Sequence, residues 1–344
     1  MVKRRPQHKK KTAALVEKVA AGLRKAFGED VVDTASYVKP YGRIRVGIPA
    51  IDWITGGGIP LGTLTEIFGD YSTGKSMLCH HIVSAVQQDG GVAVLFDAEA
   101  AYMPDFGARL GIDNDSLLYV TPDTVEDTFD YLGVTLDLLE PENPKHICFV
   151  LDSLAALSTR HEMDTDSDTR DMTKAQVVGA GLRRATRRIK KMRVAFVIVN
   201  QIREKIGVRY GSPIFTPGGK SVKFHAAVRL YLQTGKAILK KDEPVGMNGT
   251  IRCEKNKTAR PFRKVPFKMT FEEGFDQTTG LIEALEQANL LERSGAWYQL
   301  LTVDYDTGEQ EPIGKRFQGK DGLAAALEVV GDEVVEGLLS HAEE

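Results

Sequence analysis

Several features are scarce in this sequence of 344 residues. Its three cysteines, Cys79, Cys148 and Cys253, are odd in number and lack metal-site spacing, so we interpret them as reduced core thiols, not as disulfides or ligands. No apolar run approaches transmembrane length, and no signal peptide is visible. The formal net charge is −2, so no global basic field indicates a nucleic-acid partner, which only local patches could hold. These absences predict a cytoplasmic protein without a membrane partner.

The composition is otherwise ordinary. Hydrophobic residues make up 42% of the chain and charged residues 27%, as in a typical globular protein. The length is sufficient for one large α/β domain with one or two small ones. Function must therefore be inferred from motifs and their order along the chain.

The segment 69–76 has the pattern G-x-x-x-x-G-K-S, which is that of a P-loop. A short alternating strand, 64–68, precedes it and a helical pattern, 76–86, follows it, as the motif requires. Glycines let backbone N–H groups turn around a phosphate, and the helix N-terminus adds a favourable dipole. We expect Lys75 to reach the β- and γ-phosphates and Ser76 to ligate Mg²⁺. The predicted nucleotide cradle consists of Gly69, Asp70, Tyr71, Ser72, Thr73, Gly74, Lys75 and Ser76.

Continuous apolar runs of strand length recur at 91–96, 147–151 and 194–199. Helical patterns such as 124–139 and 173–192 lie between them. Strands that are apolar throughout and alternate with helices predict a buried, mostly parallel sheet. Ligands of such a sheet bind outside the carboxyl ends of its strands.

Each of these runs is followed by a polar residue that suits ATP chemistry. Asp152 occupies a Walker B position, where it would hold Mg²⁺ directly or through water. Glu99 is a candidate to orient and activate the attacking water, and Gln201 to sense the γ-phosphate. The plainer alternatives are a surface carboxylate at a strand end for Glu99 and an ordinary loop amide for Gln201.

Two loops follow these strands. The segment 160–171 is polar, acid-rich and without regular periodicity. The segment 203–223 is basic and glycine-rich and carries Tyr210 and Phe215, a composition that suits a phosphate backbone and unstacked bases. The alternative for this second loop is a solvated charged face.

The two ends of the chain differ from its centre. Residues 1–11 are basic and free of acid, which predicts either a solvated tail or a nucleic-acid or partner contact. Residues 12–27 have helical spacing with Thr12 as the expected N-cap, and their apolar face requires cover from this domain or a neighbouring subunit. Further strands are expected at 228–232, 249–253 and 265–270. We predict an N-terminal tail and helix (1–40), an ATPase core (41–277) and a small C-terminal domain with an acidic end (278–344).

Taken together, these motifs resemble one family, the bacterial and phage RecA-type recombinases, from about residue 12 to about residue 340. The resemblance is carried by the P-loop, FDAE (96–99), VLDSLAAL (150–157), VNQIR (199–203), KIG (205–207), GG (218–219), KF (223–224), KNK (255–257) and GAWY (295–298). It implies a RecA-type P-loop ATPase core with a mostly parallel central sheet, an N-terminal polymerisation helix and a small C-terminal α+β domain.

The resemblance also assigns residue roles. It makes Glu99 the catalytic glutamate, Asp152 the Walker B acid and Gln201 the link from the γ-phosphate to the following DNA loop. Lys255 and Lys257 match lysines that reach the ATP of the adjacent subunit, while Phe106 matches the aromatic that stacks on adenine and Phe224 an interface residue. The loops 160–172 and 202–219 match the two DNA-binding loops of the family. The DNA-binding residues expected from them are Arg170, Met172, Arg203, Lys205, Gly207, Arg209, Tyr210, Gly211, Gly218 and Gly219.

The implied activity is that of a DNA-dependent ATPase and recombinase that uses ATP and Mg²⁺. It would form helical filaments on single-stranded DNA and pair it with homologous duplex DNA, with single-strand-binding and mediator proteins as further partners. Its expected location is the cytoplasm of a bacterial cell or of a phage-infected host.

Some positions depart from the family pattern. Ala100 replaces the histidine that usually follows the glutamate, and Met103 replaces an aspartate that contacts adenine. In the second DNA loop, Glu204 and Arg209 each replace an apolar residue. The first DNA loop is acidic. The divergent loops favour a phage, UvsX-like member. Two other functions remain open on the same fold: a ring-shaped helicase or other motor, and a nucleotide-gated scaffold whose ATP turnover is incidental.

Overall fold

The computed structural model describes residues 6–28, 42–164, 172–204, 214–303, 310–340 and 342. The chain divides into two compact units, Met1–Tyr41 and Gly42–Glu344, which are described separately. Because the predicted boundary between core and C-terminal domain lies inside the second unit, that boundary stays a prediction.

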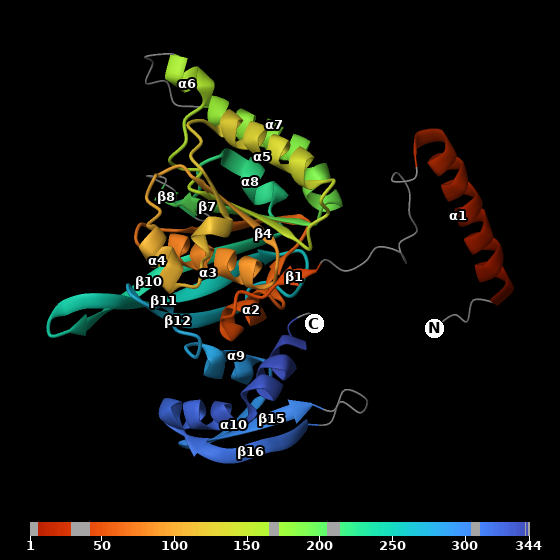
Figure 1. Ribbon diagram of the computed structural model, residues 1–344. Helices are drawn as coiled ribbons and strands as arrows, with labels where there is room; N and C mark the ends of the chain where they lie inside the picture. The colour runs from red at the N-terminus through yellow and green to blue at the C-terminus, as the bar shows by residue number, and fades with distance from the viewer. Residues whose placement is uncertain are drawn as a thin grey trace. The chain divides into compact units, whose positions relative to one another are not determined.

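Within its described residues, 6–28, the first unit contains one helix, α1 (Pro6–Phe27) (Figure 1). It begins before Thr12, so the expectation that Thr12 caps it is wrong. Proline is tolerated in the first helical turn, and lysine and glutamine are good helix formers, which explains the earlier start. Leu15, Val19 and Phe27 expose 62%, 54% and 69% of their surface. The apolar stripe predicted from the sequence is therefore present and uncovered within the described residues.

The second unit is built on a sheet of nine strands in the order β13-β12-β11-β10-β3-β7-β6-β4-β5. The segment from β10 to β5 is parallel, and β11, β12 and β13 extend it in antiparallel fashion. This confirms the predicted mostly parallel central sheet. The strands are β3 (Thr63–Gly69), β4 (Val92–Asp97), β5 (Leu117–Val120), β6 (Ile147–Asp152), β7 (Val194–Gln201), β10 (Val228–Lys240), β11 (Glu243–Asn256), β12 (Lys264–Thr270) and β13 (Gly274–Phe275).

Helices cover both faces of this sheet (Figure 1). One hydrophobic cluster joins Ile67 of β3 to Leu78 of α3, and a second joins Leu64 of β3 to Val178 of α7 and Val222 of α8. Alternate residues of one strand thus supply two cores, as the continuous apolar strands predicted. The helices of the core are α2 (Pro49–Thr55), α3 (Lys75–Gln88), α4 (Pro104–Arg109), η3 (Asn114–Ser116), α5 (Val125–Leu139), α6 (Arg160–Asp164), α7 (Met172–Lys191) and α8 (Gly219–His225), and two short strands, β1 (Arg43–Ile44) and β2 (Ile59–Pro60), pair beside them.

The C-terminal part carries a smaller antiparallel sheet in the order β14-β15-β16. Leu300 and Leu338 belong to the same hydrophobic cluster as the core strands, and Arg45 forms a bidentate ion pair with Glu336 at 2.5 and 3.0 Å. This part is therefore packed on the core. Its elements are α9 (Leu281–Gln287), β14 (Leu291–Ser294), β15 (Trp297–Val303), β16 (Gln310–Gln318) and α10 (Gly319–Ser340).

Two segments differ from the sequence expectations. Strands β10 and β11 extend well beyond the predicted 228–232 and 249–253, and they form a two-stranded ribbon that projects from the sheet (Figure 1). Residues 233–240 of β10 and the first two residues of β11 are mostly exposed, so this part of the ribbon lacks the apolar alternation by which strands are recognised. The first loop, expected to be irregular, begins with helix α6, where Thr159 and Glu162 cap each other reciprocally (2.7 and 3.1 Å).

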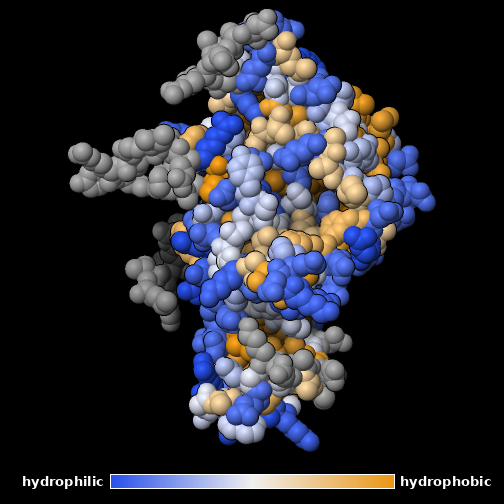
Figure 2. Space-filling model, turned by 90° about the vertical axis from the view of Figure 1, so that its left-hand side faces the viewer, coloured by the Kyte–Doolittle hydropathy of each residue, from blue (hydrophilic) through white to orange (hydrophobic). Residues whose placement is uncertain are grey.

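Hydrophilic residues cover most of the face seen in Figure 2, and hydrophobic residues reach the surface there in separate patches. No helix in the described part of the chain is both long and apolar enough to cross a membrane. All three cysteines are buried and free, as expected.

Candidate functional site

The P-loop connects the carboxyl end of β3 to the first residue of α3. Gly74 caps α3 with a left-handed φ of 88°, and a Cβ there would lie 2.6 Å from Sδ of Met269. The Lys75 ammonium donates to the Asp70 carbonyl (2.5 Å) and to Oγ1 of Thr73 (3.4 Å), so it lies across the loop. Burial lowers the pKa of Lys75, while Asp152, Asp70 and Glu99 oppose that shift. The geometry is that of an anion cradle with its cation in place.

Asp152 ends β6 beside the start of α3. It forms a hydrogen bond with Ser76, and its strand neighbour in register is Asp97 of β4. Burial raises the pKa of Asp152 to about 6, and the charges of Glu99 and Asp97 add to that shift. A buried carboxylate beside a hydroxyl, with other acids nearby, is a donor set that suits a hard divalent cation such as Mg²⁺.

Glu99 lies just beyond the end of β4, where its side chain is exposed. Ser153 donates from Oγ to Oε1 of Glu99 at 2.7 Å, and Nε2 of Gln201 lies 3.5 Å from the same oxygen. The backbone N–H of Glu99 also donates to Asp97 (3.2 Å). The structure thus brings together P-loop, Walker B acid, glutamate and glutamine at one edge of the sheet, as their positions after four strands predicted.

Phe106 lies on α4, half-buried beside α3. Its ring meets that of His80 edge-on at 5.9 Å, and the Arg109 guanidinium lies 5.3 Å from its centroid. Burial lowers the pKa of His80 to about 4, so His80 is neutral at pH 7. The exposed Met103 precedes α4 as its N-cap residue. Phe106 is therefore a supported aromatic surface at the side of α3, where a base could stack.

Lys255 and Lys257 do not join the P-loop cluster within this chain. Lys255 donates from Nζ to the carbonyls of Lys223 (2.6 Å) and Phe224 (3.3 Å), and Lys257 donates to that of Phe224 (3.2 Å). Both lysines are therefore held at the C-terminal end of α8. The side chain of Phe224 is 76% exposed there. The expected role of the two lysines at a neighbour's nucleotide stays a prediction.

The two predicted DNA loops are described only at their bases. Arg170, Lys205, Gly207, Arg209, Tyr210 and Gly211 lie outside the described residues. Met172 begins α7, and Arg203 lies in β8 (Arg203–Glu204), which pairs with β9 (Ile214–Phe215) and closes the base of the second loop. Gly218 and Gly219, both at positive φ, begin α8. A Cβ at Gly219 would lie 2.9 Å from Cβ of Ala175, so this glycine also permits close packing on α7.

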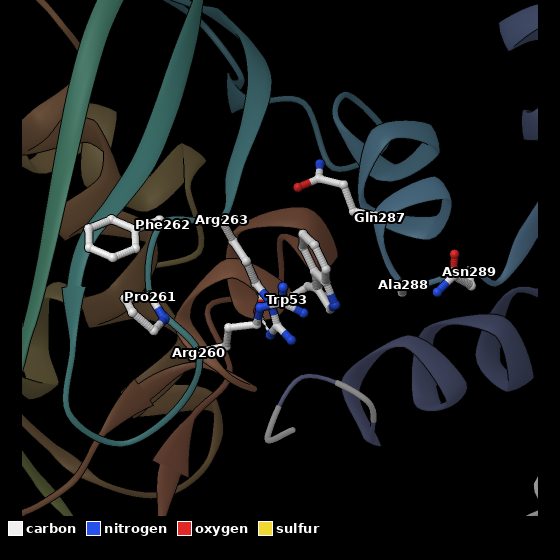
Figure 3. Close-up of a pocket in the computed structure, with 8 residues that line it drawn as sticks. All are labelled: Trp53, Arg260, Pro261, Phe262, Arg263, Gln287, Ala288 and Asn289. Carbon is white, nitrogen blue, oxygen red and sulfur yellow. Dashed lines mark hydrogen bonds between the residues drawn. The ribbon is translucent and has the colours of Figure 1, made fainter.

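A hollow of about 680 Å³ is separate from these residues. It is lined by Trp53, Arg260, Pro261, Phe262, Arg263, Gln287, Ala288 and Asn289 (Figure 3). The Arg263 guanidinium stacks 4.5 Å over the Trp53 ring and donates to the carbonyls of Trp53 (3.2 Å) and Ala342 (2.7 Å). Arg263 thus ties the core to the C-terminal part of the chain, and this hollow lies at that joint.

Sequence reasoning assigned no role to several residues at the site. Ser153 orients Glu99, and Asp97 accepts from the backbone of Glu99 and of Tyr102 (3.2 and 2.8 Å). The signal was available, because both residues directly adjoin the predicted strand ends. Polar residues inside strands, such as Glu66 of β3, gave no such signal.

Comparison with known proteins identifies close relatives. Residues 15–276 match the family described as the RecA N-terminal domain. The chain is similar to Protein RecA of Trichodesmium erythraeum, with 33% identity over 97% of this chain and 92% of the relative. It is also similar to Protein RecA of Methylobacterium sp. (32%, covering 98% and 95%) and of Pseudarthrobacter chlorophenolicus (34%, covering 92% and 89%).

Proposed function

Since the chain belongs to the RecA family of DNA-dependent ATPases and recombinases, we propose that the polar cluster at the carboxyl ends of β3, β4, β6 and β7 is its site of ATP hydrolysis. The observation that carries the proposal is the convergence of four strand ends: Lys75 lies across the P-loop, Asp152 contacts Ser76, and Glu99 lies 3.5 Å from Gln201. Such convergence is typical of nucleotide sites in parallel sheets.

Each residue has a proposed task. The backbone N–H groups of 69–76 and the Lys75 ammonium hold the phosphates. Glu99, fixed by Ser153, accepts a proton from the attacking water, and Gln201 contacts the γ-phosphate. The ring of Phe106 stacks on adenine.

Ser76 and Asp152 are the proposed holders of Mg²⁺, and their oxygen donors fit that ion. Bound there, the ion would neutralise charge on the β- and γ-phosphates.

The site is proposed to be completed by a second subunit in a filament on single-stranded DNA. Lys255 and Lys257 would approach the neighbour's ATP and stabilise charge on the transferring phosphoryl group. The base of the second DNA loop begins directly after Gln201, so γ-phosphate occupancy and loop order would change together. Homologous duplex DNA is the second substrate, and single-strand-binding and mediator proteins in a bacterial or phage-infected cytoplasm are further proposed partners.

The test is the rate of ATP hydrolysis with and without single-stranded DNA, with filaments imaged in parallel. The parent protein should hydrolyse ATP faster with DNA, and Lys75→Ala should lose hydrolysis because the phosphate-binding cation is gone. Lys236→Ala, which removes a cation from the distal ribbon, serves as the matched control. Unchanged hydrolysis in Lys75→Ala would remove the P-loop assignment. Directional unwinding by the parent would instead identify a motor.

A further inference from the structure

A buried polar cluster lies under α8, apart from the residues assigned to ATP above. It consists of Glu66 of β3, Asn200 of β7 and Arg229 of β10, with Lys255 of β11 beside it. Glu66 is fully buried and Arg229 is 8% exposed. The strand register places Arg229 next to Glu66 on one side and Lys255 on the other. Burying a carboxylate and a guanidinium is costly unless both are paired and hydrogen-bonded, so the contacts of this cluster show what it holds in place.

Both carboxylate oxygens of Glu66 have a partner. Arg229 donates from Nε to Oε2 at 2.5 Å, and Asn200 donates from Nδ2 to Oε1 at 3.1 Å. The guanidinium of Arg229 also lies 4.2 Å from the centroid of Phe68. Glu66 is thus fixed between a strand neighbour and the amide of Asn200.

Asn200 connects this carboxylate to both ends of the second DNA loop. Its Nδ2 also donates to the carbonyl of Pro217 (3.0 Å), just before α8 begins. Its Oδ1 accepts from the backbone N–H of Gln201 (3.2 Å), just before the loop begins. Because the Glu66 carboxylate and the Pro217 carbonyl only accept, the NH₂ group must face them, and the orientation of the amide is determined.

On its other side the cluster adjoins Lys255, one of the two lysines held by α8. Burial and the charges of Lys257 and Arg229 lower the pKa of Lys255 to about 8, and Glu66 is the acid that opposes them. Without the charge of Glu66, Arg229 and Lys255 would be like charges on adjacent strands, and Arg229 would lack the carboxylate that pairs with it. The Glu66 carboxylate therefore favours the charged form of Lys255.

We propose that Glu66 is a positioning residue that connects the second DNA loop, through Asn200, with the lysine pair, through Arg229. The inference rests on the proposed function, since it takes the loop as the DNA-binding segment and the lysines as cations for the neighbour's ATP. The cluster sets the relative position of the loop base and of Lys255 within one subunit. Disturbing it uncouples DNA binding from hydrolysis and leaves the P-loop of the isolated subunit able to bind nucleotide.

The experiment compares Glu66→Gln and Asn200→Asp with Thr65→Val in the full chain. Glu66→Gln removes the charge with little change in shape, and Asn200→Asp places a carboxylate against Glu66 and Pro217. Thr65 is the matched control, because it adjoins Glu66, is fully buried and has a hydroxyl without a hydrogen-bond partner in the described structure. Alternation along β3 points it to the opposite face of the sheet.

Three quantities are measured: the stimulation of hydrolysis by saturating single-stranded DNA, the Kd of a fluorescent ATP analogue without DNA, and the midpoint of thermal unfolding. We expect the stimulation to fall about tenfold in Glu66→Gln and Asn200→Asp, within the usual range of coupling between sites. The Kd should stay within about twofold of that of the parent, and Thr65→Val should behave as the parent does. Arg229→Lys, which retains the charge beside Glu66, should keep more of the stimulation than Arg229→Met.

Two results would overturn the inference. One is full stimulation in both cluster variants, and the other is a loss of nucleotide binding in proportion to the loss of stimulation, as a general structural defect would produce. If Glu66→Gln does not fold, Asn200→Asp and the Arg229 pair of variants still decide the question. A parent protein that DNA does not stimulate, or a Lys255→Ala, Lys257→Ala double variant with parental stimulation, would refute the proposed function itself.

Discussion

Burial shifts the pKa values of Lys75 and Asp152 in opposite directions. It lowers the pKa of Lys75 and raises that of Asp152 to about 6, so it disfavours the charged form of each group. A phosphate beside Lys75 and a cation beside Asp152 would favour both charged forms. Paired perturbations of this kind are characteristic of functional sites, and here they fit the two components of a metal-nucleotide complex.

Glu99→Gln tests the proposed general base. Glutamine keeps the shape of the side chain but accepts no proton, so the variant should bind ATP and assemble on DNA while hydrolysis falls by ~10²–10⁴-fold. Single-turnover hydrolysis and electron microscopy of filaments measure the two properties. A fall of less than about tenfold would indicate that another group activates the water. Ser153→Ala, which removes only the hydroxyl that orients Glu99, should give a smaller fall.

Asp52 predicts a pH dependence of stability that is separate from catalysis. Burial raises its pKa to about 7, against hydrogen bonds from the backbone of Val46 (2.8 Å) and Gly47 (3.2 Å). The folded state therefore holds a proton that the unfolded chain has released between its ordinary pKa of 3.8 and about 7. In that window Asp52 makes the free energy of unfolding fall as pH rises, by up to about 1.4 kcal/mol per pH unit. Above pH 7 its contribution is constant.

The measurement is urea unfolding of the parent and of Asp52→Asn from pH 5 to pH 8. Asparagine cannot titrate, so the difference in unfolding free energy between the two proteins isolates Asp52 from other carboxylates. It should change with pH below about 7 and level off above it. A constant difference would show that Asp52 is ionised in the folded protein throughout this range.

At the scale of elements, the parallel strands were predictable and the connections between them less so. Runs such as 147–151 are apolar because both of their faces are buried, and this leaves an unambiguous signal in the sequence. The reciprocal cap of Thr159 and Glu162 is a local signal, but it marks only where helix α6 begins. Arg160 of α6 pairs with Asp127 and Asp130 of α5 (2.6 and 2.8 Å), and contacts with side chains thirty or more positions away leave no local pattern.

Helix α1 predicts how subunits associate. Its exposed apolar stripe has a counterpart on α5, where Val134 and Leu138 expose 59% and 71% of their surface. We expect α1 of one subunit to pack there on the next, so that deletion of 1–30 leaves a folded, monomeric core. Val134→Asp should likewise shorten filaments, because it places a charge in the contact.

Leu239→Asp is the matched control for this prediction, since Leu239 is also 59% exposed but lies on the distal ribbon. Filament length by electron microscopy and mass by light scattering report the outcome. If the truncated protein forms filaments of parental length, α1 is not the polymerisation element.

At the scale of the molecule, the predicted site residues fall into two groups, and the cluster under α8 was not predicted. The P-loop, Glu99, Asp152 and Gln201 meet because parallel strands end at one edge, which topology dictates. Glu66 and Arg229 are 163 positions apart and lie within strands that carry no recognisable motif at these positions. Only the register of β3 with β10 brings them together. The role of Lys255 and Lys257 is proposed from resemblance alone, because composition does not reveal a residue that would act on another subunit.

We expect each ATP site to consist of Lys75 and Glu99 from one subunit and Lys255 and Lys257 from the next. The activity of a mixture of two inactive proteins tests this arrangement. Glu99→Gln retains the lysine pair, and the Lys255→Ala, Lys257→Ala double variant retains the glutamate. In a head-to-tail filament that contains the two variants in equal amounts, about one interface in four brings the Glu99 of the double variant together with the lysine pair of the Glu99→Gln variant.

The measurement is DNA-stimulated ATP hydrolysis by each variant alone and by the mixture at the same total protein concentration. Each variant alone should be nearly inactive, and the mixture should regain a clear fraction of the parental rate. A mixture no more active than the average of its two components, although electron microscopy shows mixed filaments, would refute an ATP site shared between subunits. It would place all the catalytic groups within a single subunit.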